Sequence, residues 1–377
     1  MSGLSGGVLD DVAAIARTDR SGMLVQVATL PAQVREAWTR SRALDLPGRH
    51  SQATSVALLG TGPAGIWGDL VAGIWSDRLK LPLAVVRGYD LPAWVGPDTL
   101  VVAGSWSGST EETLGAVEAA FQRRCPVAVI AGGGPLASVA ERVSLPLLKL
   151  PTTGRARSVV GAGVTLLAGA LERAGALPLA DDEVEAAAAE ADAALAAWGP
   201  DVPTEGNAAK QLAWALVDRI PVVVGSGALA AVARRWKTQL NENAKTTAFW
   251  DELPEASHNT VAGFPRPDSA LDHELMVLLS SPSDHPRTTL RAELTTELLE
   301  EAGIAFQSVV LDGPSRFAQA LRGIVLGDLV SAYLGVLQGV DPTPVDATAR
   351  LEDAMKDPGD TPDEGTSDPF DDDSDPA

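Results

Sequence analysis

A hydroxyl-rich turn follows the apolar run at residues 100–103 and reads Ser105-Trp-Ser-Gly-Ser-Thr-Glu-Glu-Thr. The apolar run is typical of a buried parallel strand, and the paired glutamates are typical of a helix start. Free amides at a helix N-terminus attract anions, and hydroxyls beside them add donors for a phosphate group. The candidate phosphate donors are Ser105, Ser107, Ser109 and Thr110. The same residues also fit a capping box at a helix N-terminus, so the turn alone leaves both phosphate binding and helix capping open.

A second polar block spans residues 241–259 and reads Asn-Glu-Asn-Ala-Lys-Thr-Thr-Ala-Phe-Trp-Asp-Glu-Leu-Pro-Glu-Ala-Ser-His-Asn. It follows a helical pattern over 228–240, so Glu242 falls at or just beyond a helix C-terminus. The helix dipole disfavours an anion there, which suits a carboxyl group that exchanges protons. His258 is one of only four histidines. The structural alternatives are a surface glutamate and a core or capping histidine, and the aromatic residues between them predict a semi-buried loop.

A glycine-rich turn at residues 60–69 follows another apolar run and reads Gly-Thr-Gly-Pro-Ala-Gly-Ile-Trp-Gly-Asp. Its glycine spacing matches the dinucleotide fingerprint, but Pro63 stiffens the turn and Trp67 crowds the helix that follows. No acidic residue closes the next apolar run at 82–86, as a ribose-binding site requires. We therefore expect no dinucleotide cofactor, and a tight strand-to-helix turn explains the glycines equally well.

Short apolar runs alternate with helical patterns along the chain, which predicts doubly wound parallel α/β sheets. The runs form two series, at 55–59, 82–86, 100–103, 127–131 and 145–150, and at 221–224, 275–279 and 305–311. Helices are expected at 159–174 and 181–198 and within the first fifty residues, with breaks at Pro31 and Pro47. The predicted organisation is a helical extension (1–50), a first α/β domain (51–180), connecting helices (181–218), a second α/β domain with a C-terminal helix (219–356) and an acidic tail (357–377).

Composition narrows the class of protein. The 377 residues carry a net charge of −21, and nine of these charges lie in the tail at 357–377, so the rest carries −12. Without a basic stripe we expect no nucleic-acid partner, and without a long apolar segment we expect no membrane partner. The single cysteine, Cys125, fits a cytoplasmic protein without disulfides.

Three segments together resemble one enzyme family. Residues 105–113 resemble the phosphosugar motif of the sugar isomerase (SIS) domain, and residues 241–259 resemble the Asn-Glu-Asn-Ala-Lys block of the bifunctional phosphoglucose/phosphomannose isomerases. Residues 328–344, Asp-Leu-Val-Ser-Ala-Tyr-Leu-Gly-Val-Leu-Gln-Gly-Val-Asp-Pro-Thr-Pro, are similar to that family's C-terminal helix and following turn. The resemblance spans residues 50–356.

The resemblance implies two flavodoxin-like SIS domains, a homodimer with shared active sites, and a phosphorylated hexose as substrate. It also implies aldose-ketose isomerisation of glucose 6-phosphate or mannose 6-phosphate to fructose 6-phosphate through an enediol, with no cofactor and no metal. A zinc-dependent isomerase would need clustered ligands, and His50, His258, His273 and His285 show no such spacing.

Residue roles follow from the resemblance by position. Glu242 is expected to be the base, and His258 the acid/base that opens the sugar ring, reaching across from the partner subunit. The four hydroxyl residues of the turn are expected to bind phosphate, and Gly62 lies in the turn expected at the substrate. Arg157 is expected either to stabilise the enediolate or to bind phosphate.

The chain also departs from the family pattern. Pro63 and Ala64 stand where the family has glycine and serine, and Leu351-Glu352 stands where it has Leu-Lys, with Lys356 four residues further on. A catalytically impaired protein that binds sugar phosphates, with a regulatory role, is therefore the alternative to an active isomerase.

Overall fold

The computed structural model describes residues 7–264 and 266–355. The acidic tail expected at 357–377, and Lys356, lie outside the described residues. The chain begins with a short turn and four helices: Val8–Asp10, α1 (Val12–Thr18), α2 (Met23–Val27), α3 (Leu30–Arg42) and α4 (Gly48–Ser51). Pro31 lies in the first turn of α3 and Pro47 precedes α4, so both prolines lie where one helix gives way to the next, at the expected breaks.

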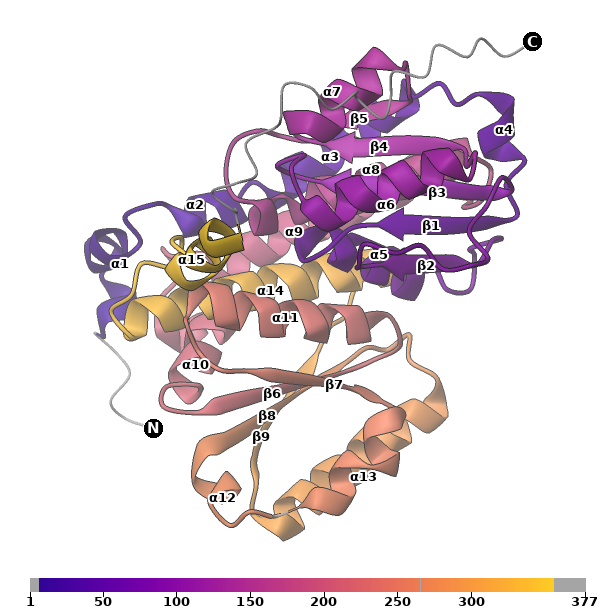
Figure 1. Cartoon of the computed structure of the whole chain (residues 1–377). Coiled ribbons are helices and arrows are strands. Elements are labelled where there is room, and N and C mark those ends of the chain that lie inside the picture. Colours follow the sequence, from indigo (N-terminus) through magenta and orange to yellow (C-terminus); the bar gives the residue numbers. More distant parts are fainter. Residues whose placement is uncertain (1–6, 265, 356–377) are drawn as a thin grey trace, which may run out of the picture. The chain divides into compact units, whose positions relative to one another are not determined.

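The first sheet is parallel and has the order β2-β1-β3-β4-β5, the flavodoxin-like order (Figure 1). Its strands are β1 (Ser55–Leu59), β2 (Leu83–Val86), β3 (Thr99–Ser105), β4 (Val127–Ala131) and β5 (Leu147–Lys149). Its helices are α5 (Pro63–Ile74), α6 (Glu111–Gln122), α7 (Gly134–Arg142) and α8 (Val160–Arg173), the last preceded by the turn Ala156–Val159. All five strands coincide with the predicted apolar runs to within two residues at each end.

The second sheet is also parallel, with the order β7-β6-β8-β9. Its strands are β6 (Ile220–Ser226), β7 (Phe249–Leu253), β8 (Glu274–Ser280) and β9 (Ala305–Val310). Its helices are α11 (Ala230–Asn243), α12 (Ala270–His273), α13 (Pro286–Ala302) and α14 (Arg316–Leu337), and short turns occupy Gly227–Leu229, Glu255–His258 and Thr260–Gly263. The predicted two-series α/β fold is therefore confirmed.

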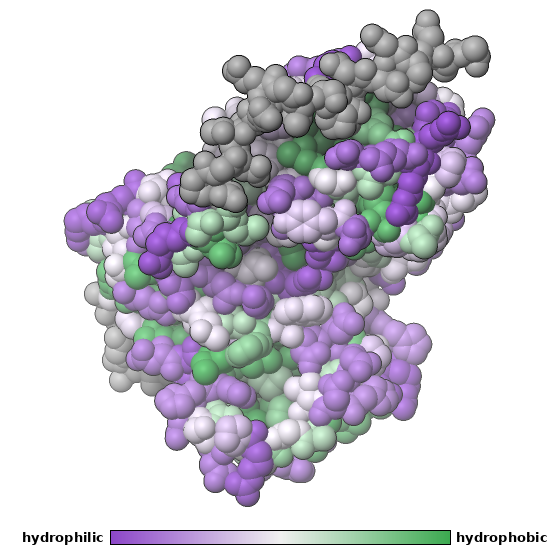
Figure 2. Space-filling model, viewed as in Figure 1, coloured by the Kyte–Doolittle hydropathy of each residue, from purple (hydrophilic) through white to green (hydrophobic). Residues whose placement is uncertain are grey.

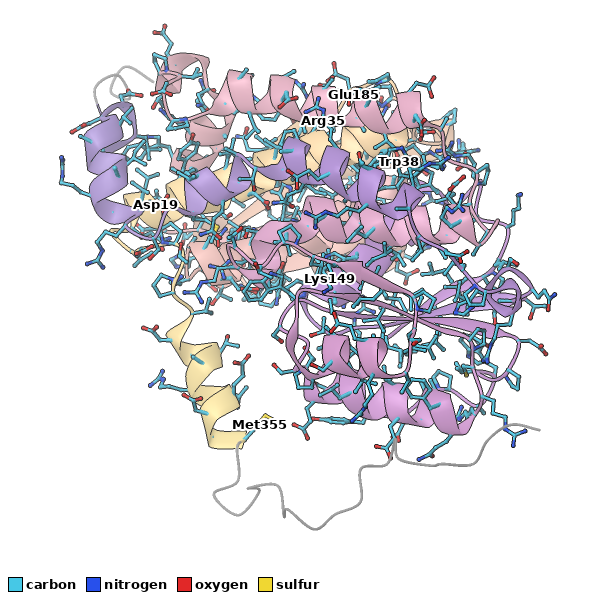
Figure 3. The ribbon with its side chains drawn as sticks, turned by 90° about the horizontal axis from the view of Figure 1, so that it is seen from above. Asp19, Arg35, Trp38, Lys149, Glu185 and Met355 are labelled. Carbon is cyan, nitrogen blue, oxygen red and sulfur yellow. The ribbon has the colours of Figure 1, made fainter. Side chains whose placement is uncertain are left out.

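Two further helices connect the sheets, α9 (Asp181–Trp198) and α10 (Ala208–Ala215), with the turn Thr204–Gly206 between them. The helix α3 packs on α8 and α9. Arg35 of α3 lies beside Glu185 of α9 at 2.7 Å (Figure 3). Trp38 of α3 donates to Asp181 of α9 at 2.9 Å. The helix α15 (Asp346–Met355) belongs to a separate compact unit that begins at Pro344, and all its residues are exposed.

The loop predicted at the aromatic residues 249–254 is wrong, because residues 249–253 form strand β7. β7 is an edge strand that pairs only with β6 among the described strands. Phe249 is 56% exposed and Trp250 is 36% exposed, so neither is a core residue. An edge strand buries too little of itself to give the continuous apolar signal on which the prediction relied.

In each half of the fold, a tryptophan of one helix packs directly against a glycine of a neighbouring helix. The pairs are α5 with α8 in the first half and α11 with α14 in the second. A Cβ on Gly163 of α8 would lie 2.1 Å from the Trp67 ring of α5, and one on Gly327 of α14 would lie 2.2 Å from the Trp236 ring of α11. Only glycine permits these approaches. The shared core therefore lies between the two sheets, while α6 and α7 cover the outer face of the first sheet and α13 covers that of the second (Figure 1).

One helix among the described residues, α14, is long and apolar enough to cross a membrane. Its most apolar window is 89% buried within the protein. A core helix meets the same length and composition criteria, so α14 is a core helix here.

We predict that Gly163→Ala destabilises the protein by about 1–3 kcal/mol, because the added methyl group must displace the Trp67 ring. Gly48→Ala is the matched control, since nothing lies within 4 Å of a Cβ at that position. Urea unfolding of the two variants measures the difference. Equal midpoints for both would show that α8 and α5 are not in this close contact.

Candidate functional site

The first sheet has its topological switch point between β1 and β3. From β1 the chain crosses to β2 on one side, and β3 pairs with β1 on the other. Ligands of open α/β sheets bind at the carboxyl ends of the strands at such a point. The glycine turn after β1 and the hydroxyl turn after β3 meet there, since a Cβ on Gly60 would lie 3.3 Å from the Gly104 carbonyl oxygen.

The serines of the hydroxyl turn differ in burial, since Ser105 is buried and Ser107 and Ser109 are exposed. Ser105 is 2% exposed, and its Oγ accepts from the Gly108 amide at 3.0 Å and bonds to Thr110 Oγ1 at 2.8 Å. Ser107 and Ser109 are exposed, and Ser107 Oγ accepts from the amide and the hydroxyl of Ser109 at 3.2 and 3.1 Å. Ser105 thus holds the turn, while the other two hydroxyls face solvent.

No side chain caps the N-terminus of α6, where the hydroxyl turn meets the helix. Thr110 precedes α6 and makes no side-chain cap to it, so the capping-box interpretation is wrong and the first amides of α6 need another acceptor. Gly108 has a φ of 69°, and a Cβ there would lie 1.8 Å from the Gly133 carbonyl oxygen. The Leu136 amide donates to the Gly108 carbonyl at 2.9 Å. Glycine at 108 is therefore required both by φ and by the neighbouring loop.

Glu242 lies in the last turn of α11, as the helical pattern predicted. Its Oε2 is 3.3 Å from a terminal nitrogen of Arg157, and its side chain is 32% exposed. Lys245 donates to the Glu242 carbonyl oxygen. The sequence pattern indicated the helix end but not the arginine, because 85 residues separate the two side chains.

Arg157 is 4% exposed and most of its donors are occupied by the protein. Its Nε donates to Asn243 Oδ1 at 2.8 Å, and one terminal nitrogen donates to the carbonyls of Pro342 and Thr343 at 3.0 and 2.8 Å. Burial lowers the pKa of the Arg157 guanidinium below its usual value, and the charge of Glu242 opposes that shift. The other terminal nitrogen of Arg157 faces Glu242 and forms an ion pair with its carboxylate.

Gly62 and Glu242 lie at the same end of an antiparallel helix pair. Asp69 of α5 contacts Arg234 of α11 at 3.0 Å, and further along α5 a Cβ on Gly73 would lie 3.6 Å from Ala228 before α11. The start of α5 therefore runs beside the end of α11. Gly62 has a φ of 53° and open space around its Cβ position. The glycine turn and Glu242 thus lie at the same end of this helix pair, and the hydroxyl turn adjoins the glycine turn.

His258 does not join Glu242 within one chain. Leu253 at the end of β7 pairs with Ser226 at the end of β6, and the chain enters α11 directly after that end. Glu242 lies at the other end of α11, about 20 Å away along a helix of 14 residues. His258 lies five residues beyond β7, near the protein surface.

A charged cluster that no sequence pattern predicted lies beside the glycine turn. The Asp69 carboxylate accepts from Arg87 at 2.5 Å and from Arg234 at 3.0 Å, and Arg87 also donates to the Gly65 carbonyl at 3.2 Å. The Arg234 guanidinium lies 5.5 Å from the Trp250 ring centre. Two cations on one carboxylate leave a positive charge that suits an anionic ligand. No spacing rule links these residues, since the sheet and α11 bring them together.

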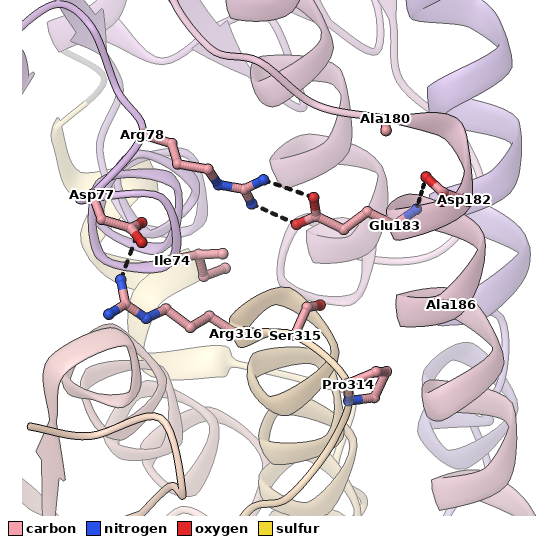
Figure 4. Close-up of a pocket in the computed structure, with 10 residues that line it drawn as sticks. All are labelled: Ile74, Asp77, Arg78, Ala180, Asp182, Glu183, Ala186, Pro314, Ser315 and Arg316. Carbon is pink, nitrogen blue, oxygen red and sulfur yellow. Dashed lines mark hydrogen bonds and ion pairs between the residues drawn. The ribbon is translucent and has the colours of Figure 1, made fainter.

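A hollow of about 490 Å³ lies elsewhere, beyond the far end of α5. Figure 4 shows its charged walls, where Asp77 pairs with Arg316 at 3.1 Å and Arg78 with Glu183 at 2.5 Å. The end of α5 adjoins the start of α11, so this hollow is remote from Glu242. Its charged side chains largely satisfy one another, and we assign it no part in the site.

Several relatives that match most of this chain carry the same name. Residues 205–355 match the model of the bacterial phospho-glucose isomerase C-terminal SIS domain. The bifunctional phosphoglucose/phosphomannose isomerase of Caldicellulosiruptor bescii is 32% identical over 324 residues, covering 86% of this chain and 96% of the relative. The enzyme of that name from Aquifex aeolicus is 32% identical, covering 80% and 90%.

A solved structure supports the fold. The crystal structure of a hypothetical protein from Thermus thermophilus superimposes with a TM-score of 0.71 at 21% identity, covering 93% of this chain and 95% of that one. At this identity the likeness concerns architecture alone. The sequence relatives decide the family, and with 96% of one relative matched at 32% identity this chain belongs to the bifunctional phosphoglucose/phosphomannose isomerases.

Proposed function

We propose that this protein interconverts glucose 6-phosphate or mannose 6-phosphate with fructose 6-phosphate. The observation that carries the proposal is the Glu242 carboxylate, held 3.3 Å from the buried Arg157 at the end of α11 that adjoins the start of α5. Relatives named as phosphoglucose/phosphomannose isomerases support the same reaction. A carboxylate that carries a proton between neighbouring carbons needs no metal, so we propose a metal-free route without a cofactor.

The reaction conserves all atoms of the sugar. Glu242 removes the proton from C2 of the open-chain aldose, which gives an enediol, and the same carboxyl returns that proton to C1. The proton of the C2 hydroxyl passes to the C1 oxygen, so the carbonyl moves from C1 to C2. One base on one face of the enediol serves both carbon steps.

Arg157 is better suited to the enediolate than to the phosphate. Its Nε and one terminal nitrogen are committed to Asn243 and to backbone carbonyls, and only the nitrogen facing Glu242 is turned towards the reacting region. A fixed guanidinium beside the base stabilises the negative charge that develops on the sugar oxygens.

The phosphate is proposed to bind at the hydroxyl turn. Ser107, Ser109 and Thr110 supply donors together with the first amides of α6, and Ser105 supports the turn from within. The positive charge left at the Asp69 cluster favours the same anion. Gly62 leaves room for the sugar, since nothing lies within 4 Å of its Cβ position.

His258 is proposed to open the sugar ring from the partner subunit of a homodimer. Within one chain it lies at the opposite end of α11 from Glu242, so a second copy must supply the histidine of each site. We also infer a cytoplasmic location, which suits the single buried Cys125.

A protein that only binds sugar phosphates is the less favoured alternative. The relatives of this chain are named as enzymes, and the chain retains both the candidate base and the arginine beside it. Turnover separates the two functions, because a binding protein is stabilised by fructose 6-phosphate without converting it.

We predict that Glu242→Gln lowers kcat by about 10²–10⁴-fold, because the amide cannot accept the C2 proton. Coupled assays offer glucose 6-phosphate and mannose 6-phosphate separately, in buffer containing EDTA. Glu300→Gln, on the exposed face of α13, is the control and keeps full activity. Equal rates for the two variants would remove Glu242 from catalysis, and no turnover by the unmodified protein would favour the binding function.

Shared active sites predict complementation between two inactive variants. Glu242→Gln and His258→Ala, mixed after unfolding and refolding together, regain about a quarter of the unmodified activity, since half the dimers are mixed and each holds one intact site. Each variant refolded alone is the control. If the mixture stays as inactive as its parents, both residues act within one subunit.

Gly108→Ala is predicted to raise KM for the phosphosugar at least about tenfold, because the methyl group collides with the Gly133 carbonyl and disrupts the anion turn. Gly133→Ala is the matched control in the adjoining loop, where nothing lies within 4 Å of the Cβ position. Steady-state kinetics of both variants decide the case. An unchanged KM in Gly108→Ala would place the phosphate elsewhere.

A further inference from the structure

The helix α11 is followed by a lysine that adopts a left-handed backbone conformation. Lys245 comes directly after the C-cap residue of α11 and has a φ of 57°. Two other long helices, α8 and α14, carry glycine at the corresponding position, Gly175 with a φ of 76° and Gly339 with a φ of 71°. A residue with a Cβ is disfavoured in this conformation, whereas glycine adopts it readily. Such strain beside a candidate site leads us to ask what the lysine side chain does there.

The Lys245 side chain folds back over the end of α11. Its Nζ donates to the backbone carbonyl of Glu242, the candidate base, and to the Pro342 carbonyl at 3.1 Å. Arg157 donates to the same Pro342 carbonyl at 3.0 Å. One carbonyl after α14 therefore binds two cations, of which Arg157 pairs with the Glu242 carboxylate and Lys245 holds the Glu242 backbone.

The lysine is fixed although it lies at the surface. Lys245 is exposed, and Figure 2 shows hydrophilic side chains gathered across the middle of this face of the molecule, around α11. An exposed lysine loses rotamer freedom when its ammonium group is held in one place. Both the backbone and the side chain of Lys245 are thus held in states that an isolated lysine disfavours.

We propose that Lys245 is a positioning residue for Glu242. Its ammonium group ties the Glu242 backbone to the acceptor that also fixes Arg157, so the carboxylate and the guanidinium keep their separation. The carbonyls of a last helical turn lack partners within the helix, and without the lysine this one turns towards water. A misplacement of about 1 Å can lower a rate about 10²-fold. Lys245 therefore acts on the rate of proton transfer and not on the binding of phosphate.

Steady-state kinetics of Lys245→Gly in the full chain test this role. We expect kcat to fall at least about tenfold and KM for fructose 6-phosphate to change less than about twofold, because the base moves while the hydroxyl turn keeps its contacts. The urea midpoint is expected not to fall. Glycine favours the left-handed conformation, and Asn241 and Gln338 still bond to Thr246 at 2.8 and 2.9 Å. A loss of kcat without a loss of stability separates positioning from a merely structural role.

Ser144→Gly is the matched control. Ser144 follows α7 in the same conformation, with a φ of 54°, and α7 ends at the edge of the first sheet where the strands begin, away from the ligand turns. This variant is expected to keep kcat. Lys245→Arg is the conservative variant, and it is expected to keep at least about half of kcat because a guanidinium also donates to carbonyl oxygens.

Two kinetic results would overturn the positioning role. One is an unchanged kcat in Lys245→Gly, whether or not KM rises. The other is a Lys245→Arg variant as slow as Lys245→Gly, since the carbonyl contacts would then not be what matters.

This inference rests on the proposed function, and a crystal structure of Lys245→Gly keeps the two apart. We expect the distance from Glu242 Oε2 to the Arg157 guanidinium to exceed about 4 Å, the limit of an ion pair, against 3.3 Å in the unmodified chain. If the unmodified protein shows no turnover and the variant loses this contact, the isomerase function is wrong and the positioning role stands. If turnover is normal and the variant keeps the contact, the positioning role is wrong and the isomerase function stands.

Discussion

The buried guanidinium of Arg157 is the constraint on which the candidate site depends. It precedes α8, donates to Asn243 at the end of α11, and donates to two backbone carbonyls after α14. Asn243 in turn donates to Ser331 of α14 at 3.0 Å. Three helices from both halves of the fold therefore meet at one side chain. Glu242 takes its position from this junction, because it neighbours Asn243 on α11 and pairs with the same arginine.

A second buried arginine, Arg235, stabilises that junction by bonding to the Arg157 backbone. Arg235 pairs with Asp328 at 2.7 Å, both side chains are almost fully buried, and Arg235 also donates to the Arg157 carbonyl at 2.9 Å. Burial raises the pKa of Asp328, and the charge of Arg235 offsets that shift. Removing one partner of such a pair costs about 3–5 kcal/mol, more than a typical exposed ion pair contributes. The junction is thus fixed by desolvated charges, which tolerate little displacement.

The sequence indicates those parts of the structure whose signal is local. β4 matches its predicted run at both ends because both its faces are buried, and α11 begins within two residues of its predicted start. β7 was missed because Phe249 and Trp250 face outwards on an edge strand. The internal role of Ser105 and the pairing of Arg157 with Glu242 depend on contacts between distant segments, so no spacing rule reveals them. The family resemblance predicted that Glu242 and His258 serve the same active site. Within one chain, the fold places them at opposite ends of α11.

Two departures from the family pattern, Pro63 and Ala64, fall outside this junction. Pro63 is the first residue of α5, a position that proline favours, and the turn before it is made by Gly62 with its positive φ. Ala64 is 5% exposed and its methyl group lies against the Gly60 and Gly104 positions, so it fills the space between the two turns. Its substitution for serine removes a hydroxyl without redirecting the backbone. Glu352 lies in the separate unit with α15. Neither Pro63 nor Ala64 bonds to Arg157 or Glu242 among the described contacts, so we expect these two departures to act on the affinity for the sugar and to leave the Arg157–Glu242 pair in place.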